Sequence, residues 1–63
     1  MVEVPKDLAK ALAADSDARA TFDALTASQK LGFVAPIEAA KKPETRERRI
    51  KSTIERLRAG QKR

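Results

Sequence analysis

Apolar residues in this chain recur at intervals of three and four positions, the spacing that places side chains on one face of an α-helix. Segments with this pattern lie over about residues 5–14, 16–25, 27–41 and 43–59. No stretch shows alternating apolar and polar residues on both sides of a turn dipeptide, so strands are not expected. The pattern predicts an all-α fold, a small bundle of three to four short helices around one core, with residues 1–63 forming a single helical domain.

Residues with strong positional preferences mark the ends of these segments. Pro5 suits the first position of a helix, and Asp15 is a good N-cap for the second helix. The segment 26–29, Thr-Ala-Ser-Gln, fits a capping box at the start of the third. Gly60 follows the fourth helix, where a left-handed residue often stands, and residues 61–63 are expected to form a frayed tail.

Pro36 conflicts with the helical pattern of the third segment. A proline inside a helix removes a backbone donor and clashes with the carbonyl four residues earlier. That residue is Gly32, the position best able to bend away. We expect a kinked third helix, and a break into two short helices is the alternative.

The fourth segment carries an arginine on its apolar side. At about 100° per residue, Arg46, Ile50 and Ile54 fall within about 40° of one direction, that of the apolar stripe. One interpretation is that Arg46 grips an anionic ligand at the start of the helix. The interpretation we favour is a structural anchor that binds a carboxylate, of Asp7 or Glu38, or backbone carbonyls of a neighbouring helix.

Charge is distributed unevenly along the chain, whose formal net charge is +5. Residues 1–40 hold four Lys/Arg and six Asp/Glu, a net charge of −2, whereas residues 41–63 hold ten and three, a net charge of +7. This asymmetry predicts an acidic partner: nucleic acid, an anionic membrane surface or an acidic protein. The candidate partner-binding residues are the basic ones outside the apolar stripe: Lys41, Lys42, Arg48, Arg49, Lys51, Arg56 and Arg58.

Among these partners we favour an acidic protein over nucleic acid. Several Lys/Arg on one helix would bind phosphates in a salt-dependent, sequence-independent way, so a weak, non-specific nucleic-acid-binding domain is the alternative function. No aromatic residue is placed to stack on bases, which disfavours single-strand recognition. A plainer interpretation is a solvated face with i, i+4 ion pairs between Glu44 and Arg48 and between Glu47 and Lys51.

The composition argues against an enzyme. The chain contains no Cys and no His, so Ser28 and Ser52 lack the usual general base and no thiol is available. The run from Asp15 to Asp17 resembles the start of a calcium loop, but Arg19 occupies the next ligand position and helix capping explains it better. So small a core is also expected to leave no pocket of about 300 Å³. We therefore expect no catalytic residue, cofactor or metal site.

The N-terminal segment is not typical of a secretory signal, because it has neither a basic region nor an apolar stretch. The longest apolar run, residues 33–37, is far shorter than a membrane span. The expected location is the cytoplasm, and the sequence predicts no oligomeric state.

The segment 40–50, Ala-Lys-Lys-Pro-Glu-Thr-Arg-Glu-Arg-Arg-Ile, carries a family resemblance. It is similar to the Ala-Lys-x-x-Glu-Thr-Arg-x-Arg-Arg-Ile signature of the YdeI/OmpD-associated (bacteriocin-protection) family. The upstream patterns Val4-Pro5-x-Asp7-Leu8-x-x-Ala11-Leu12 and Phe22-x-x-Leu25-x-x-Ser28 are also similar to that family. The sequence departs from it at Pro36, where relatives usually carry an aromatic residue, so the third helix is expected to lack a large core side chain.

The resemblance implies a helical domain, often found at the C-terminus of longer bacterial proteins. It links the chain to envelope stress and bacteriocin resistance without implying a biochemical activity or a catalytic residue. Composition and resemblance together predict a non-enzymatic interaction or structural module.

Overall fold

The fold is entirely helical over residues 3–60, the part of the chain that the computed structural model describes. Its helices are α1 (Lys6–Ala13), α2 (Ser16–Asp23), α3 (Ala27–Ala39) and α4 (Pro43–Arg58). No strand occurs in this part of the chain, and the predicted all-α fold is confirmed. The predicted frayed tail at 61–63 lies outside the described residues.

Each helix is slightly shorter than the sequence pattern suggested. Pro5 precedes α1 as its N-cap instead of occupying the first helical position, because its ψ of 147° is not helical. The third helix stops at Ala39, since Ala40 is extended with ψ of 124°. Lys42 is extended as well, with ψ of 137°, as expected for a residue that precedes proline. These extended residues let the chain turn before Pro43 starts α4.

Local hydrogen bonds fix the starts of α2 and α3. The Asp15 carboxylate accepts a hydrogen bond from the backbone N–H of Ala18 at 3.1 Å, as its predicted capping role requires. The backbone N–H of Gln29 donates to the Thr26 hydroxyl at 3.2 Å, and the N–H of Thr26 donates to the Gln29 side chain at 3.0 Å. The capping box is therefore confirmed. Gly60 has a φ of +80°, which confirms the left-handed residue expected after α4.

Pro36 lies inside α3 without ending it. The helix continues over Ala27–Ala39, so the alternative of two short helices is wrong; the bend near Gly32 stays a prediction. The Pro36 side chain is exposed. The prediction that this position belongs to the core is therefore wrong, and α3 packs through Phe33, Val34 and Ile37 instead.

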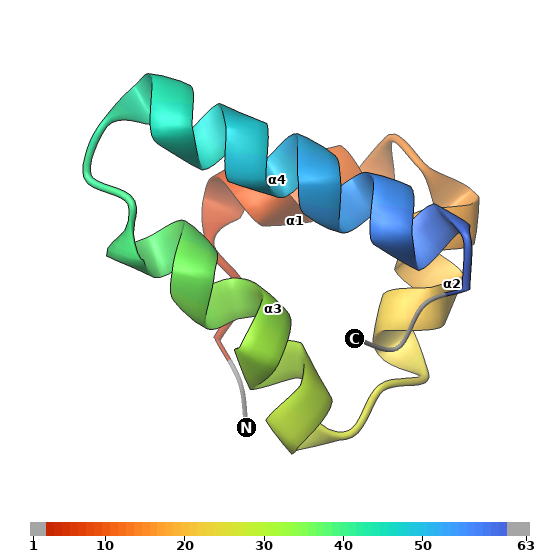
Figure 1. Cartoon of the computed structure of the whole chain (residues 1–63). Coiled ribbons are helices and arrows are strands. Elements are labelled where there is room, and N and C mark those ends of the chain that lie inside the picture. The colour runs from red at the N-terminus through yellow and green to blue at the C-terminus, as the bar shows by residue number, and fades with distance from the viewer. Residues whose placement is uncertain (1–2, 61–63) are drawn as a thin grey trace.

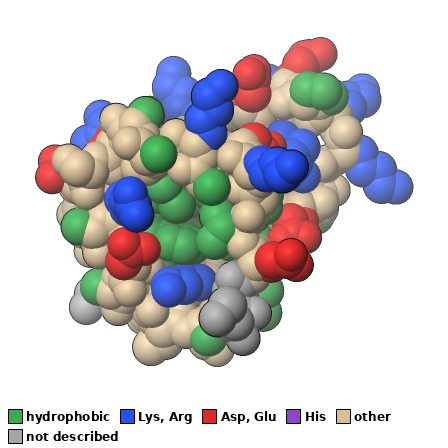
Figure 2. Space-filling model, turned by 180° about the vertical axis from the view of Figure 1, so that it is seen from behind, with side chains coloured by type: hydrophobic (Ala, Val, Ile, Leu, Met, Phe, Trp, Pro, Cys, Tyr) green, Lys and Arg blue, Asp and Glu red, His purple; other side chains and the backbone are tan. Residues whose placement is uncertain are grey.

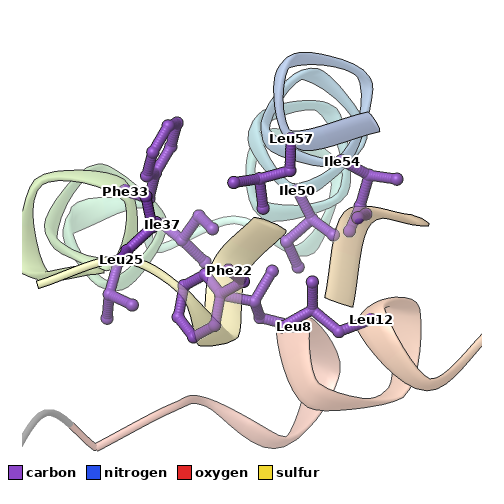
Figure 3. Close-up of a cluster of buried hydrophobic side chains, with 11 residues drawn as sticks. Leu8, Leu12, Phe22, Leu25, Phe33, Ile37, Ile50, Ile54 and Leu57 are labelled. Atoms are coloured by element: carbon purple, nitrogen blue, oxygen red, sulfur yellow. The ribbon is translucent and has the colours of Figure 1, made fainter. Parts of the chain in front are cut away.

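The hydrophobic core draws on all the helices and on Leu25 between α2 and α3 (Figure 3). Leu8 of α1, Ile37 of α3 and Leu57 of α4 are fully shielded, each with 0% exposure. Figure 3 shows these side chains converging from separate helices, with the Phe22 ring among them. One core of this kind links each helix to the others.

The long helix α4 connects the two ends of the molecule. It contacts each of the other helices. In Figure 1 its start lies near the end of α3 and its end lies near α2, while α1 lies beside it. Side chains at the two ends of α4 are therefore placed against different neighbours.

Candidate functional site

The C-terminal end of α3 is closed by arginines from α4. A helix ends with carbonyls that lack intrahelical partners, and α3 has no basic residue in its own last turn. Arg46 Nη1 donates to the Ile37 carbonyl at 3.0 Å, and Arg49 Nη1 donates to the Pro36 carbonyl. Both cations also lie at the negative end of the helix dipole. The arginines at the first and fourth positions of Arg46-Glu-Arg-Arg49 thus act as a C-cap for another helix.

Arg46 also binds α1 through two hydrogen bonds to one carboxylate. Its Nε donates to Asp7 Oδ2 at 2.9 Å and its Nη2 donates to Asp7 Oδ1 at 3.1 Å. The predicted contact with Asp7 is therefore present. This paired geometry is typical of strong Arg–carboxylate recognition. The hydrogen bond from Arg46 lowers the pKa of Asp7, and the same bond raises the pKa of Arg46.

All three guanidinium nitrogens of Arg46 are therefore used inside the molecule, by a carboxylate of α1 and a carbonyl of α3. Only 27% of its side chain is exposed. An external anion would have to displace one of these partners. The geometry favours the anchor over the alternative of a ligand-binding arginine.

A second charged pair joins the far end of α4 to α2. Arg58 Nε donates to Asp15 Oδ2 at 2.7 Å, while the other oxygen of this carboxylate caps α2 through the N–H of Ala18. The hydrogen bond from the Ala18 N–H, followed by that from Arg58, lowers the pKa of Asp15. The Arg58 side chain remains 59% exposed. This pair therefore holds its two helices together from the surface.

Charges of both signs share one flank of α4, where Glu47, Lys51 and Glu55 line the groove toward α1. At about 100° per residue, Arg48 lies next to this flank, within about 40° of Glu44 and Glu55. From Arg48 through Arg56 to Arg49, the arc contains no carboxylate. We call this arc, together with the connection before α4, the basic strip; its members are Lys41, Lys42, Arg48, Arg49 and Arg56, and all are exposed.

The structure divides the predicted partner-binding residues into two groups. Arg49 and Arg58 have partners within the molecule, namely the Pro36 carbonyl and Asp15. In residues 3–60 no ion pair involves the others, which are Lys41, Lys42, Arg48, Lys51 and Arg56.

The predicted i, i+4 ion pairs of α4 are wrong. Neither Glu44 with Arg48 nor Glu47 with Lys51 is paired, and the single i, i+4 ion pair of residues 3–60 joins Arg19 to Asp23 at 3.8 Å. Arg48 and Lys51 therefore keep their charges available to a partner.

Surface hollows are larger than a core of this size suggested. A groove of about 780 Å³ runs between α1 and α4, and two other hollows measure about 340 and 310 Å³. The prediction of no pocket of about 300 Å³ is therefore wrong. Figure 2 shows a hollow with hydrophobic side chains on its floor and charges of both signs around it. These hollows are open to solvent.

The groove between α1 and α4 is lined by apolar and charged side chains. Ala11, Ile50 and Ile54 line it together with charged residues such as Lys10 and Glu55. Within residues 3–60, no group of three or more His, Cys, Asp or Glu side chains could hold a metal ion.

Over the same residues, no helix is both long and apolar enough to cross a membrane.

Sequence reasoning missed two structural roles. Arg49 was assigned only to a partner surface, although it caps α3, and Asp15 was assigned only to a helix cap, although it also binds Arg58. No signal in the sequence indicated the Arg49 cap, because the predicted segment 27–41 ends on Lys41, whereas α3 ends at Ala39 without a basic residue in its last turn.

These features define a small all-α domain in which arginines of the last helix join the other helices. The chain belongs to the family described as bacteriocin-protection, YdeI or OmpD-associated, which matches residues 1–60. This match confirms the resemblance found in the sequence. No curated protein and no solved structure matches the chain.

Proposed function

We propose that this chain is a non-enzymatic interaction module that binds an acidic protein surface in the cytoplasm through the basic strip. The observation that carries this proposal is an arc of α4 on which Arg48, Arg56 and Arg49 follow one another with no carboxylate between them. An acidic partner would meet positive charge there that no ion pair within residues 3–60 compensates. Through its family, the module is proposed to act in bacterial envelope stress or bacteriocin resistance.

The aromatic residues support a protein partner over nucleic acid. Phe22 and Phe33 are the only aromatic residues of the chain, and each is 4% exposed. Neither can stack on a base, which removes the main sequence-tolerant contribution to single-strand binding. Binding to duplex DNA would then rest on phosphates alone and would be weak and strongly dependent on salt.

The absence of Cys and His from the sequence supports a non-enzymatic role. Catalysis by an activated Ser needs a base within hydrogen-bond reach. Ser28 and Ser52 both lie on exposed helix faces, and the side chain of neither forms a hydrogen bond with another residue of 3–60. Arg46, the most constrained cation, is fully used by Asp7 and the end of α3.

Affinity capture with matched charge variants tests this proposal. The strip variant is Arg48→Glu with Arg56→Glu, and Arg49 is left unchanged because it caps α3. The control is Lys6→Glu with Lys10→Glu, which changes the net charge equally on α1. We expect the strip variant to lose an acidic protein that the wild type and the control both retain. Equal retention by both variants would contradict the proposal.

A further inference from the structure

The exposed face of α3 is almost entirely apolar. It consists of Ser28, Leu31, Gly32, Ala35, Pro36 and Ala39, which lie together at about 100° per residue, Gly32 being half-buried and the others exposed; we call this set the α3 face. The exposed side chain of Glu38 borders it beside Leu31, about 20° away on the same scale. Leu31 is 55% exposed and is the large hydrophobic residue left outside the core in residues 3–60. An amphipathic helix on a protein surface normally turns polar residues outward. Helix α3 is instead apolar on both its buried and its exposed sides.

Positive charge borders this face at one edge and at one end. Arg49 lies at the edge, because its guanidinium donates to the carbonyl of Pro36. Lys41 and Lys42 lie just beyond the end of α3, and both are exposed. The acid of α3, Glu38, is placed toward Arg46, whose pKa it helps to raise. The α3 face and the basic strip therefore adjoin.

We propose that the α3 face and the adjoining basic strip form one docking surface for an amphipathic helix of a partner protein, with an apolar stripe and acidic residues along one flank. This inference rests on the proposed function and specifies the partner. The stripe would cover Leu31 and Ala35, and the acidic flank would meet Arg49 and Lys41. Helices commonly bind apolar surfaces in this way, through residues at i, i+3, i+4 and i+7.

Charge decides between this occupant and a second copy of the chain. Two copies that met symmetrically through the α3 face would bring their basic strips together, and like charges across an interface are strongly unfavourable. A partner with acids beside its apolar stripe removes this repulsion. The small residues beside Leu31, such as Gly32 and Ala35, also let a partner helix approach closely.

A titration of the isotope-labelled full chain with synthetic helical peptides tests this inference. One peptide has leucines at i, i+3, i+4 and i+7 with glutamates along one flank. A second has the same composition with the stripe scrambled, and a third replaces the glutamates by lysines. We expect the first peptide alone to perturb the backbone amide signals of Leu31, Ala35 and Ala39, together with that of Arg49.

Two neutral substitutions separate the apolar contact from the charge. Leu31→Gln should weaken binding of the first peptide roughly tenfold or more, because an exposed leucine would otherwise be buried. Ala20→Gln, at an exposed position of α2, should leave the affinity unchanged. Circular dichroism should show the same helix content in both variants, since neither residue belongs to the core.

The remaining outcomes overturn the inference in distinguishable ways. Signals confined to α4, with equal affinities for the two variants, would exclude the α3 face and leave the proposed function standing. Failure of the first peptide to bind at all would also reject the inference. The proposed function would then still be decided by the affinity capture with the Arg48→Glu, Arg56→Glu variant. A dimer of the chain alone that Leu31→Gln dissociates would assign the face to a second copy.

Discussion

Arg46 and Asp7 show how one side chain can set the relative positions of three helices. The guanidinium of Arg46 binds the Asp7 carboxylate of α1 and the Ile37 carbonyl of α3 while its own backbone belongs to α4. A lysine carries its donors on a single nitrogen, which cannot reach the Asp7 carboxylate and the Ile37 carbonyl in the directions that the planar guanidinium provides. The role of this arginine is therefore geometric as well as electrostatic.

Replacing Arg46 should destabilise the fold more than replacing its exposed neighbour. Arg46→Ala removes the guanidinium donors from the Asp7 carboxylate and leaves the Ile37 carbonyl with the N–H of Ala40 alone. It should therefore lower Tm by roughly 4 °C or more relative to Arg48→Ala. Arg46→Lys should recover only part of the loss. Thermal unfolding followed by circular dichroism measures this difference. Equal midpoints for Arg46→Ala and Arg48→Ala would contradict the role of Arg46 as a structural anchor.

The pKa shifts of Asp7 and Asp15 predict loss of stability in acid. Both carboxylates bind arginine in the folded chain, and their pKa values lie below the ordinary value of 3.8. The contribution of these two carboxylates to the free energy of unfolding is complete above pH 3.8. It is lost as the pH falls through their lower pKa values in the folded chain. The midpoint of unfolding should therefore fall as the pH is lowered through this range.

Asp7→Asn offers a direct test of this pH dependence. The variant should be less stable at neutral pH and should lose less stability on acidification, because its side chain does not titrate. Asp17→Asn serves as the control, since Asp17 is exposed and forms no ion pair within residues 3–60. Parallel curves of Tm against pH for the wild type and Asp7→Asn would contradict a stabilising ion pair between Asp7 and Arg46.

At the scale of elements, α3 is the least self-sufficient helix. It is capped at its start by its own residues and at its end by arginines of α4, and it contains Pro36. Proline removes the N–H that would bond to the Gly32 carbonyl. Helix α3 therefore lacks one backbone hydrogen bond, and packing by Phe33, Val34 and Ile37 supports the helix on either side of Pro36.

Pro36→Ala should stabilise α3. Alanine restores the hydrogen bond to Gly32 at an exposed position, which is favourable by about 1–3 kcal/mol after allowance for the greater freedom of the unfolded chain. Ala35→Gly, at the adjacent exposed position, should act oppositely by about 1 kcal/mol. Urea unfolding measures both free energies. A lower free energy of unfolding for Pro36→Ala would indicate that the fold needs a bend in α3.

The elements themselves could be predicted from the sequence because their signals are local. Apolar spacing located each helix, and the caps at Asp15 and Thr26 lie within four residues of the groups that they bind. The ends of α1 and α3 were less accurate, because they depend on how Pro5 and Ala40 turn the chain. Local signals of this kind do not specify how the helices face one another.

The candidate site was predicted less completely for the same reason. The anchor at Arg46 could be inferred, since a charged residue on an apolar stripe must find a partner. The cap by Arg49 and the pair of Arg58 with Asp15 depend on residues 13 and 43 positions apart. No periodicity in one sequence indicates such contacts, nor does it show that the exposed face of α3 adjoins the basic strip.

For the whole molecule, the separation of charge matters more than its total. The negative excess of residues 1–40 and the positive excess of residues 41–63 separate charge along the chain, and the basic strip gathers part of the positive excess on one arc of α4. A partner guided by this field should associate more slowly as salt is added, since exposed charges are screened over about 8 Å at physiological ionic strength.

The most direct test of an acidic protein partner is a fluorescence anisotropy titration of the full chain with labelled duplex DNA, at low salt and at about 0.15 M salt. We expect at most weak binding at low salt and no measurable binding at the higher concentration, because only phosphate contacts are available. The titration is repeated with Arg48→Glu combined with Arg56→Glu. Tight binding at about 0.15 M salt that this variant abolishes would contradict the account and assign the basic strip to nucleic acid.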